Sequence, residues 1–136
     1  MIAVVDANAA VEIGAERARA NEFRALLDEV DYILAPSLMA SEAANALWKC
    51  HKIGGAPLDG CRQALESAIE CVDEFIPDEE LASDALALAC SHSHAAYDMF
   101  YLALARVTGA ALLTMDTRLK DHARKHSIPL LDEPST

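Results

Sequence analysis

Four acidic residues stand where a carboxylate could act on a bound substrate: Asp6, Glu42, Asp98 and Asp116. Asp6 directly follows the apolar run at 2–5, and Asp116 directly follows the run at 112–115. In an open α/β sheet, ligands bind beyond the carboxyl ends of the strands, so a polar residue just after a buried strand is well placed for chemistry. Each residue could instead serve only as the N-cap of the next helix, because Asp is a common capping residue.

Asp98 and Glu42 lie inside segments with a helical pattern. The segment around Asp98 is apolar on every face, and an Asp is almost never buried unless it is paired, hydrogen-bonded or bound to a metal. Its place in the first helical turn offers a second explanation, a favourable interaction with the helix dipole. Glu42 lies one turn into a helix that begins near Ser37, among small alanines. It could also be an ordinary residue on a solvated helix face.

If the four carboxylates converge, their charges need a counter-charge. Two like charges about 4 Å apart repel by about 1 kcal/mol in water and by about 4 kcal/mol at an effective dielectric constant near 20. A bare cluster would therefore raise its own pKa values. Carboxylate and water oxygens are the ligands that Mg²⁺ or Mn²⁺ prefers. Such a cation could polarise a phosphoryl oxygen and activate a bound water.

The elements that must position these acids alternate between strands and helices. Buried strands are predicted at 2–5 and 110–114, a further strand at 32–34, and edge strands at 72–76 and 128–131. Helices are predicted at 7–30, 37–54, from 57 onward, 78–90, 97–107 and 117–126. This alternation favours an α/β domain with a mainly parallel sheet and right-handed crossovers. We expect residues 1–131 to form a single domain and residues 132–136 to fray.

The composition limits the classes of protein that the chain can belong to. Its 136 residues are 53% hydrophobic with only 5 Gly and 5 Pro, which excludes disorder and collagen-like repeats. The most apolar stretch, at 99–115, is interrupted by Arg106, so no membrane span is expected. The first residues lack the basic region of a secretory signal, which favours a cytoplasmic protein. A net charge of −11 requires any polyanionic substrate to be held locally.

Four short blocks of sequence resemble a known family. They read VDAN at 5–8, SEAANAL at 41–47, YDMFYLALA at 97–105 and LLTMD at 112–116. In this order, and in a chain of this length, they resemble the signature blocks of the PIN domain. The resemblance is in particular to the VapC-like toxin ribonucleases of bacterial and archaeal toxin–antitoxin pairs, and it covers essentially the whole chain.

The resemblance implies a three-layer α/β/α sandwich with a central, mainly parallel sheet, and cleavage of RNA that depends on Mg²⁺ or Mn²⁺. The family's four acidic positions, which are both catalytic and metal-binding, fall on Asp6, Glu42, Asp98 and Asp116. The small polar residues Asn8 and Thr114 match groups that orient these carboxylates or a water. A homodimer and a cognate antitoxin protein are implied as partners.

Two features depart from the pattern of the family. The residues after Asp116 supply no further acid, so the number of metal ions stays open between one and two. The strongly acidic net charge is also unusual for an enzyme that cuts RNA. These departures keep an alternative open, in which the chain is a catalytically weak PIN-like binding module that acts through a protein partner.

Two basic residues, Arg118 and Lys120, lie beside the expected site on the helix predicted after Asp116. Proteins hold nucleic acids largely through contacts to the phosphates. We therefore hypothesise that both side chains bind RNA. The alternative is that they belong to a solvated helix face.

Two pairs of histidines suggest metal binding at first sight. His92 and His94 are two residues apart, and residues at this spacing on a helix do not face one another. His122 and His126 share one face of a helix, but the sequence shows no third ligand beside them. We interpret both pairs as lying outside any metal site, and His122 and His126 as surface residues.

Overall fold

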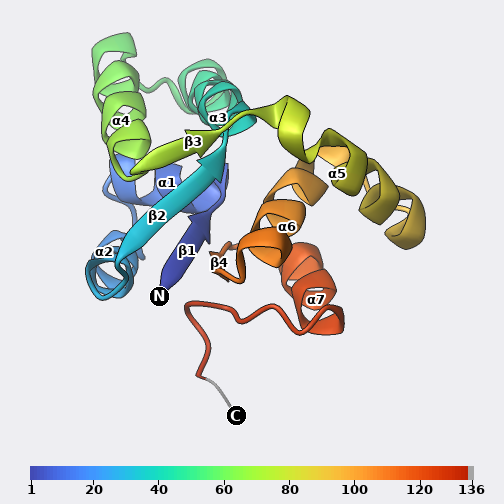
Figure 1. Cartoon of the computed structure of the whole chain (residues 1–136). Helices are drawn as coiled ribbons and strands as arrows, with labels where there is room; N and C mark the ends of the chain where they lie inside the picture. Colours follow the sequence, from blue (N-terminus) through green and yellow to red (C-terminus); the bar gives the residue numbers. More distant parts are fainter. Residues whose placement is uncertain (135–136) are drawn as a thin grey trace.

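A parallel sheet of four strands in the order β3-β2-β1-β4 forms the centre of the computed structural model, which describes residues 1–134 (Figure 1). The strands are β1 (Ile2–Val5), β2 (Tyr32–Pro36), β3 (Glu74–Ile76) and β4 (Ala111–Leu113). The central strand β1 pairs in parallel with β2 and with β4. Val4 and Val5 are fully buried there, which explains the continuous apolar run of this strand.

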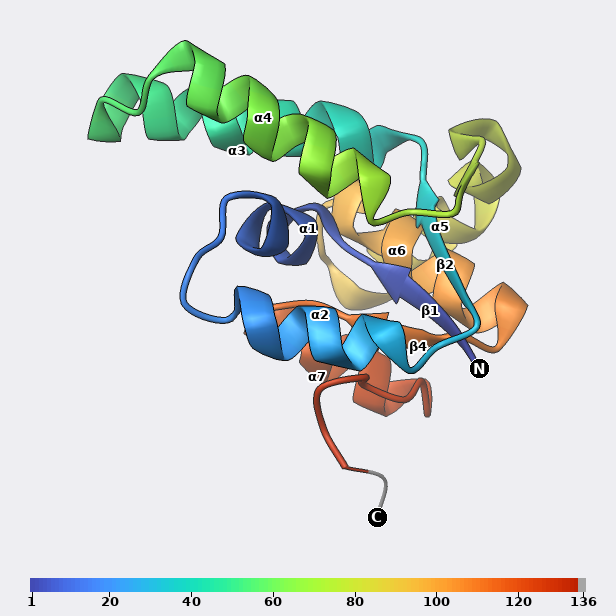
Figure 2. The ribbon, with the colours of Figure 1, turned by 90° about the vertical axis from the view of Figure 1, so that its left-hand side faces the viewer.

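Helices cover both faces of the sheet, as Figures 1 and 2 show. The helices are α1 (Ala7–Gly14), α2 (Ala20–Asp28), α3 (Leu38–Gly54), α4 (Leu58–Glu70), α5 (Asp78–His92), α6 (Ala96–Thr108) and α7 (Thr117–Lys125). Helices α1, α2 and α4 lie on one side, and α5, α6 and α7 lie on the other. Helix α3 begins just after β2 and packs against α1 and α4. The three-layer α/β/α architecture with a parallel sheet is therefore confirmed.

Across residues 1–134, no helix combines the length and the apolar character that crossing a membrane requires.

The single helix predicted for residues 7–30 is wrong, because the chain breaks between α1 and α2. Glu16 adopts a positive φ of 53°, which ends the helical path. The buried Glu12 accepts a hydrogen bond of 3.0 Å from the backbone N–H of Arg19 and so stabilises the turn. Just before the break, α1 packs closely on α4 at Gly14, where a Cβ atom would lie 2.3 Å from the carbonyl oxygen of Ala64.

The C-terminal edge strand predicted at 128–131 is reduced to one bridge, between Leu112 and Leu130. Leu112 donates its backbone N–H to Pro129, and Leu131 donates its own to Leu112, at 2.8 and 2.9 Å. Because Pro129 has no N–H of its own, the ladder does not extend along this segment.

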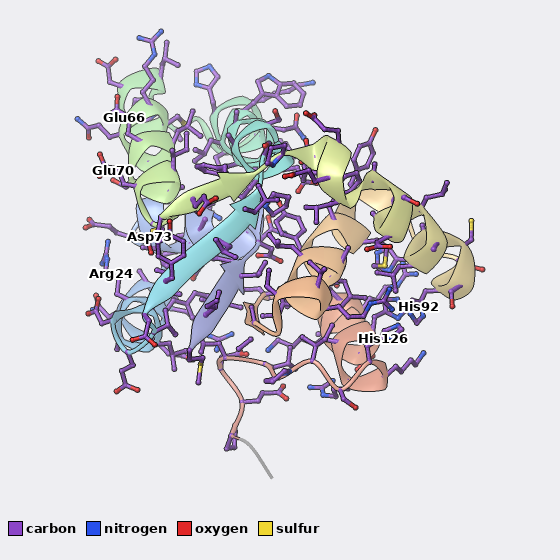
Figure 3. The ribbon with its side chains drawn as sticks, in the orientation of Figure 1. Arg24, Glu66, Glu70, Asp73, His92 and His126 are labelled. Carbon is purple, nitrogen blue, oxygen red and sulfur yellow. The ribbon has the colours of Figure 1, made fainter. Side chains whose placement is uncertain are left out.

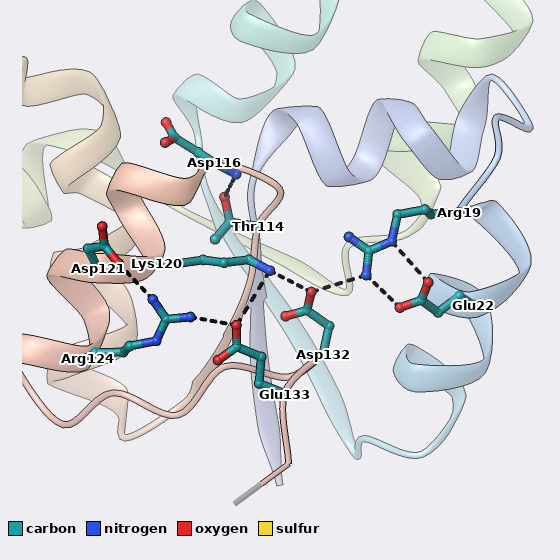
Figure 4. Close-up of polar contacts among 9 residues, drawn as sticks. All are labelled: Arg19, Glu22, Thr114, Asp116, Lys120, Asp121, Arg124, Asp132 and Glu133. Atoms are coloured by element: carbon teal, nitrogen blue, oxygen red, sulfur yellow. Dashed lines mark hydrogen bonds and ion pairs between the residues drawn. The ribbon is translucent and has the colours of Figure 1, made fainter.

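The segment 132–136, which we expected to fray, begins with an ion-paired residue. The side chain of Asp132 is only 2% exposed and contacts Lys120 at 2.8 Å and Arg19 at 3.3 Å (Figure 4). Glu133 pairs with Arg124 at 2.6 Å. The end of the chain is thus tied to α7 and to the α1–α2 turn up to residue 133, while residues 135–136 lie outside the described part.

The close approach of α1 to α4 predicts that Gly14→Ala is strongly destabilising. The new methyl group would overlap backbone atoms of Ala64 and Ala68, so the two helices would have to move apart. We expect a loss of about 1–3 kcal/mol in the free energy of unfolding, measured in urea. Gly60→Ala is the matched control, because nothing lies within 4 Å of a Cβ at this position on α4. Equal stability of the two variants would contradict the packing described here.

Candidate active site

The parallel register of β1 and β4 brings Asp6 and Thr114 together where the two strands end. Val5 lies opposite Leu113, and the backbone N–H of Asp6 donates to the Leu113 carbonyl at 3.1 Å. The Thr114 hydroxyl donates to Oδ2 of Asp6, and the backbone N–H of Ala9 donates to Oδ1 at 2.9 Å. Asp6 therefore caps α1 and is held by a side chain from the neighbouring strand.

Burial raises the pKa of Asp6 from its ordinary value of 3.8 to about 7. The hydrogen bonds from Thr114 and Ala9 act in the opposite direction, and the charges of Asp116 and Asp98 raise the pKa further. The fold thus keeps a carboxyl group in a place where its ionised form is costly. A cation beside it would reduce that cost.

Asp116 is joined to the same hydroxyl group as Asp6. Its backbone N–H donates to Oγ1 of Thr114 at 3.0 Å (Figure 4). Its Oδ1 accepts hydrogen bonds from the backbone N–H groups of Arg118 and Leu119 at 2.9 and 3.2 Å, so Asp116 is the N-cap of α7. Capping and a place in the site coexist here, because only one carboxylate oxygen is used by the helix.

Glu42 is held by Tyr101 across the gap between α3 and α6. The Tyr101 hydroxyl, on a fully buried ring, donates to Oε1 of Glu42 at 2.5 Å. Burial raises the pKa of Glu42, although the bond from Tyr101 lowers it, and the charge of Asp98 raises it further. Glu42 is half-buried, so it does not lie on a solvated helix face.

Asp98 lies in the first turn of α6 with its side chain 36% exposed. Its Oδ2 forms a hydrogen bond of 2.8 Å with Nε2 of His94. The charge of Asp98 raises the pKa of both Asp6 and Glu42, so it lies near both of them.

The structure brings all four predicted acids to the wall of one open pocket of about 490 Å³. Asn8 lines this pocket as well, whereas Thr114 does not line it and acts on it through its hydrogen bonds with Asp6 and Asp116. Two further residues on the wall, Asn45 and Lys49, were missed by the sequence reasoning. They follow Glu42 by three and seven residues, so helical spacing on α3 could have identified them.

Neither predicted RNA-binding side chain lines the pocket. The side chain of Lys120 is 14% exposed, and its ammonium group pairs with the buried Asp132 (Figure 4). Arg118 is exposed in the first turn of α7, next to Asp116. Because Lys120 is engaged within the fold, the two residues differ in their freedom to bind a phosphate.

The donors at this pocket suit a hard divalent cation that keeps part of its water shell. Within residues 1–134, no three His, Cys, Asp or Glu side chains approach closely enough to hold one ion by themselves. Mg²⁺ usually keeps several waters and binds through one or two carboxylates, so it does not need a closed protein cage.

The comparison with protein families decides the assignment. Residues 3–125 match the model of the PIN domain. The chain belongs to the PIN-domain family. Over 120 residues this PIN domain is 32% identical to ribonuclease VapC3 of Pyrobaculum aerophilum, an alignment that covers 87% of this chain and 92% of that protein. It is therefore a VapC-like PIN domain.

The fold is also similar to a solved structure. The crystal structure of PAE2754 from Pyrobaculum aerophilum superposes with a TM-score of 0.72 and covers 90% of this PIN domain and 79% of that chain. The sequences are 23% identical, so this similarity concerns the fold alone.

The raised pKa of Asp6 predicts that Asp6→Asn stabilises the fold at neutral pH when divalent cations are removed. An acid whose pKa is raised in the folded state contributes stability that is complete below about pH 4 and is lost as the pH rises through about 7. The side-chain amide of Asn does not ionise, so the variant does not lose stability in this way as the pH rises. With EDTA at pH 8 we expect the variant to gain on the order of 2–4 kcal/mol, because one pKa unit corresponds to about 1.4 kcal/mol.

Thermal unfolding at several pH values measures this effect, and the gain should shrink towards pH 4. Asp84→Asn, an exposed change on α5, is the matched control and should change nothing. A wild-type protein that is more stable than Asp6→Asn at pH 8 in EDTA would contradict the prediction.

Proposed function

We propose that this PIN domain is an endoribonuclease that depends on Mg²⁺ or Mn²⁺, and that it is the toxin of a toxin–antitoxin pair. The observation that carries the proposal is the meeting of four carboxylates, from four different segments of the chain, at one pocket. The curated relative, named a ribonuclease, supports the reaction class. Asp6, Glu42, Asp98 and Asp116 would hold the cation, partly through waters.

Hydroxyl groups of the protein hold the carboxylates in place before any cation binds. The bound cation would polarise a phosphoryl oxygen and lower the pKa of a water. Thr114 fixes Asp6 and the backbone of Asp116 with one hydroxyl group. Tyr101 fixes Glu42, and its own pKa is raised by burial and by that carboxylate, so its hydroxyl stays a donor. Carboxylates that are held in advance lose little freedom when they bind.

Lys49 gives the pocket a cationic side chain that can hold an RNA phosphate. A chain with a net charge of −11 repels a polyanion overall, so it needs local cationic contacts of this kind to bind RNA. Arg118, exposed beside Asp116, stays a second predicted contact at the rim. Lys120 is proposed only as a weaker contact, because its charge is already paired with Asp132.

A protein partner is supported by apolar side chains exposed along α3 and α4. Trp48 and Leu58 line a small apolar groove between these helices, and the neighbouring Ile53 is 83% exposed. Exposed apolar patches mark protein contacts in many proteins. A homodimer, an antitoxin and a cytoplasmic location complete the proposal.

Cleavage of a mixed pool of tRNA and rRNA tests the proposed activity. We expect cutting with Mg²⁺ or Mn²⁺, no cutting with EDTA, and a loss of more than about 100-fold in Asp6→Asn, because even residues that only orient a ligand contribute about 10–100-fold. Asp84→Asn controls for the loss of a surface charge. Cutting that survives both EDTA and Asp6→Asn would contradict the proposal. Absence of both cutting and Mn²⁺ binding would favour the alternative of a PIN-like binding module.

The pocket wall predicts different effects for two lysines. Lys49→Gln should weaken RNA binding and lower the slope of log affinity against log salt concentration by about one, as expected for the loss of one phosphate contact. Lys125→Gln is the matched control and should leave this slope nearly unchanged, since Lys125 is exposed at the end of α7 and does not line the pocket. Filter binding of RNA to the Asp6→Asn protein measures both without cleavage. If the control variant lowered the slope and Lys49→Gln did not, RNA would not contact the residues that line this pocket.

A further inference from the structure

Four of the five histidines of the chain gather between α5, α6 and α7. Figure 3 shows His92, at the end of α5, close to His126, just after α7. His94 and His122 complete the cluster, and the rings of His92 and His122 lie 4.2 Å apart between centroids. The two pairs therefore form one group, and the expectation that His122 is a surface residue is wrong, because its side chain is buried in this group. Only the fold could reveal this, because 28 residues separate His94 from His122.

Hydrogen bonds between ring nitrogens organise this cluster. Nε2 of His92 lies 2.7 Å from Nε2 of His126, and Nδ1 of His94 lies 3.0 Å from Nε2 of His122. In the described chain, no three donors here converge on a common point that could hold a metal ion. The group is thus a set of hydrogen-bonded rings and not a closed metal site.

A further hydrogen bond of His94 links this cluster to the proposed active site. His94 uses Nδ1 towards His122 and Nε2 towards Oδ2 of Asp98, at 3.0 and 2.8 Å. An ionised carboxylate only accepts hydrogen bonds, so Nε2 of His94 carries the proton. In the Nε2–H tautomer of His94, Nδ1 is an acceptor for the Nε2–H of His122. Two hydrogen bonds thus connect His122 through His94 to Asp98.

Packing alone does not explain these two rings. The side chain of His94 is 5% exposed and His122 is buried. Nδ1 of His122 is buried without a hydrogen-bond partner among residues 1–134, which an apolar ring of similar size would avoid. Burial and the neighbouring histidines lower the pKa of His122, which favours its neutral form.

Asp98, like Glu42, has its carboxylate held by one side chain, whereas the other two acids are held by the backbone as well. Asp6 and Asp116 each receive backbone N–H bonds as helix caps. In the described part of the chain, the His94 ring is the one hydrogen-bond partner of the Asp98 carboxylate. Without His94, this partly exposed side chain would be free to rotate away from the pocket.

We propose that His94, oriented by His122, is a positioning residue that holds the Asp98 carboxylate towards the pocket. The inference rests on the proposed function, because it gives Asp98 the role of a cation ligand. Partners that orient metal ligands in this way typically contribute about 10–100-fold in metal affinity. His94 touches neither substrate nor cation and acts through Asp98.

Mn²⁺ binding without RNA, measured by electron paramagnetic resonance of the free ion, tests the proposal. His94→Leu should weaken Mn²⁺ binding by about 10–100-fold. His94→Gln, whose amide N–H can replace Nε2–H, should keep most of the wild-type affinity. His126→Leu disturbs the same cluster but not the two hydrogen bonds that connect His122 and His94 to Asp98. It is therefore the matched control and should bind Mn²⁺ like the wild type.

The outcomes separate this inference from the proposed function. If Asp98→Asn abolishes Mn²⁺ binding while His94→Leu binds like the wild type, the positioning role is wrong and the metal site stands. Equal losses in His94→Leu, His94→Gln and His126→Leu would show a purely structural cluster and would also overturn the role. If the wild type itself binds no Mn²⁺, the proposed function fails and the inference falls with it.

A measurement on the wild type avoids any folding defect of a variant. Long-range ¹⁵N–¹H correlation spectra distinguish the two neutral tautomers of a histidine ring. We expect the proton on Nε2 of both His94 and His122. A proton on Nδ1 of His94, with Nε2 bare, would leave no donor for Asp98 and would overturn the proposal.

Discussion

The burial of one carboxyl group, Asp6, is the constraint on which the site depends. The end of the central strand β1 places it in the interior, where its ionised form is costly and its pKa rises to about 7. Thr114 and the first turn of α1 hold it with hydrogen bonds, while Asp98 and Asp116 add like charges. The fold therefore gathers carboxyl groups whose ionised forms a divalent cation is suited to stabilise.

The parallel sheet makes this arrangement possible. Strands β1 and β4 end at the same edge, so residues more than a hundred positions apart meet there. Helices α3 and α6 close the pocket from two sides and bring Glu42 and Asp98 to it. Polar side chains behind the acids, such as Tyr101 and His94, fix their orientation. Positions of this kind are costly for stability and useful for binding, which is common at functional sites.

The sequence was sufficient to predict the fold class and to select the four acids that line the pocket. Local patterns pointed to Asp6 and Asp116, which follow buried strands, and to Asp98, which interrupts an apolar helix. Glu42 was selected through the resemblance to the PIN domain, because its own surroundings fit a solvated helix face equally well. The break between α1 and α2 was missed because it depends on the positive φ of Glu16 and on the hydrogen bond from Arg19 to the buried Glu12, which a helical pattern does not reveal. The pairing of Lys120 with Asp132 and the meeting of the histidines depend in the same way on tertiary contacts, which local periodicity does not contain.

The pKa of the Asp6 carboxyl group, followed by ¹³C NMR with and without Mg²⁺, tests the central claim most directly. The account predicts a pKa near 7 without divalent cations and a clear decrease when Mg²⁺ is added, because the cation favours the ionised form. Asp84, exposed on α5, serves as the internal reference in the same spectra. An Asp6 pKa close to 4 that does not respond to Mg²⁺ would contradict the account.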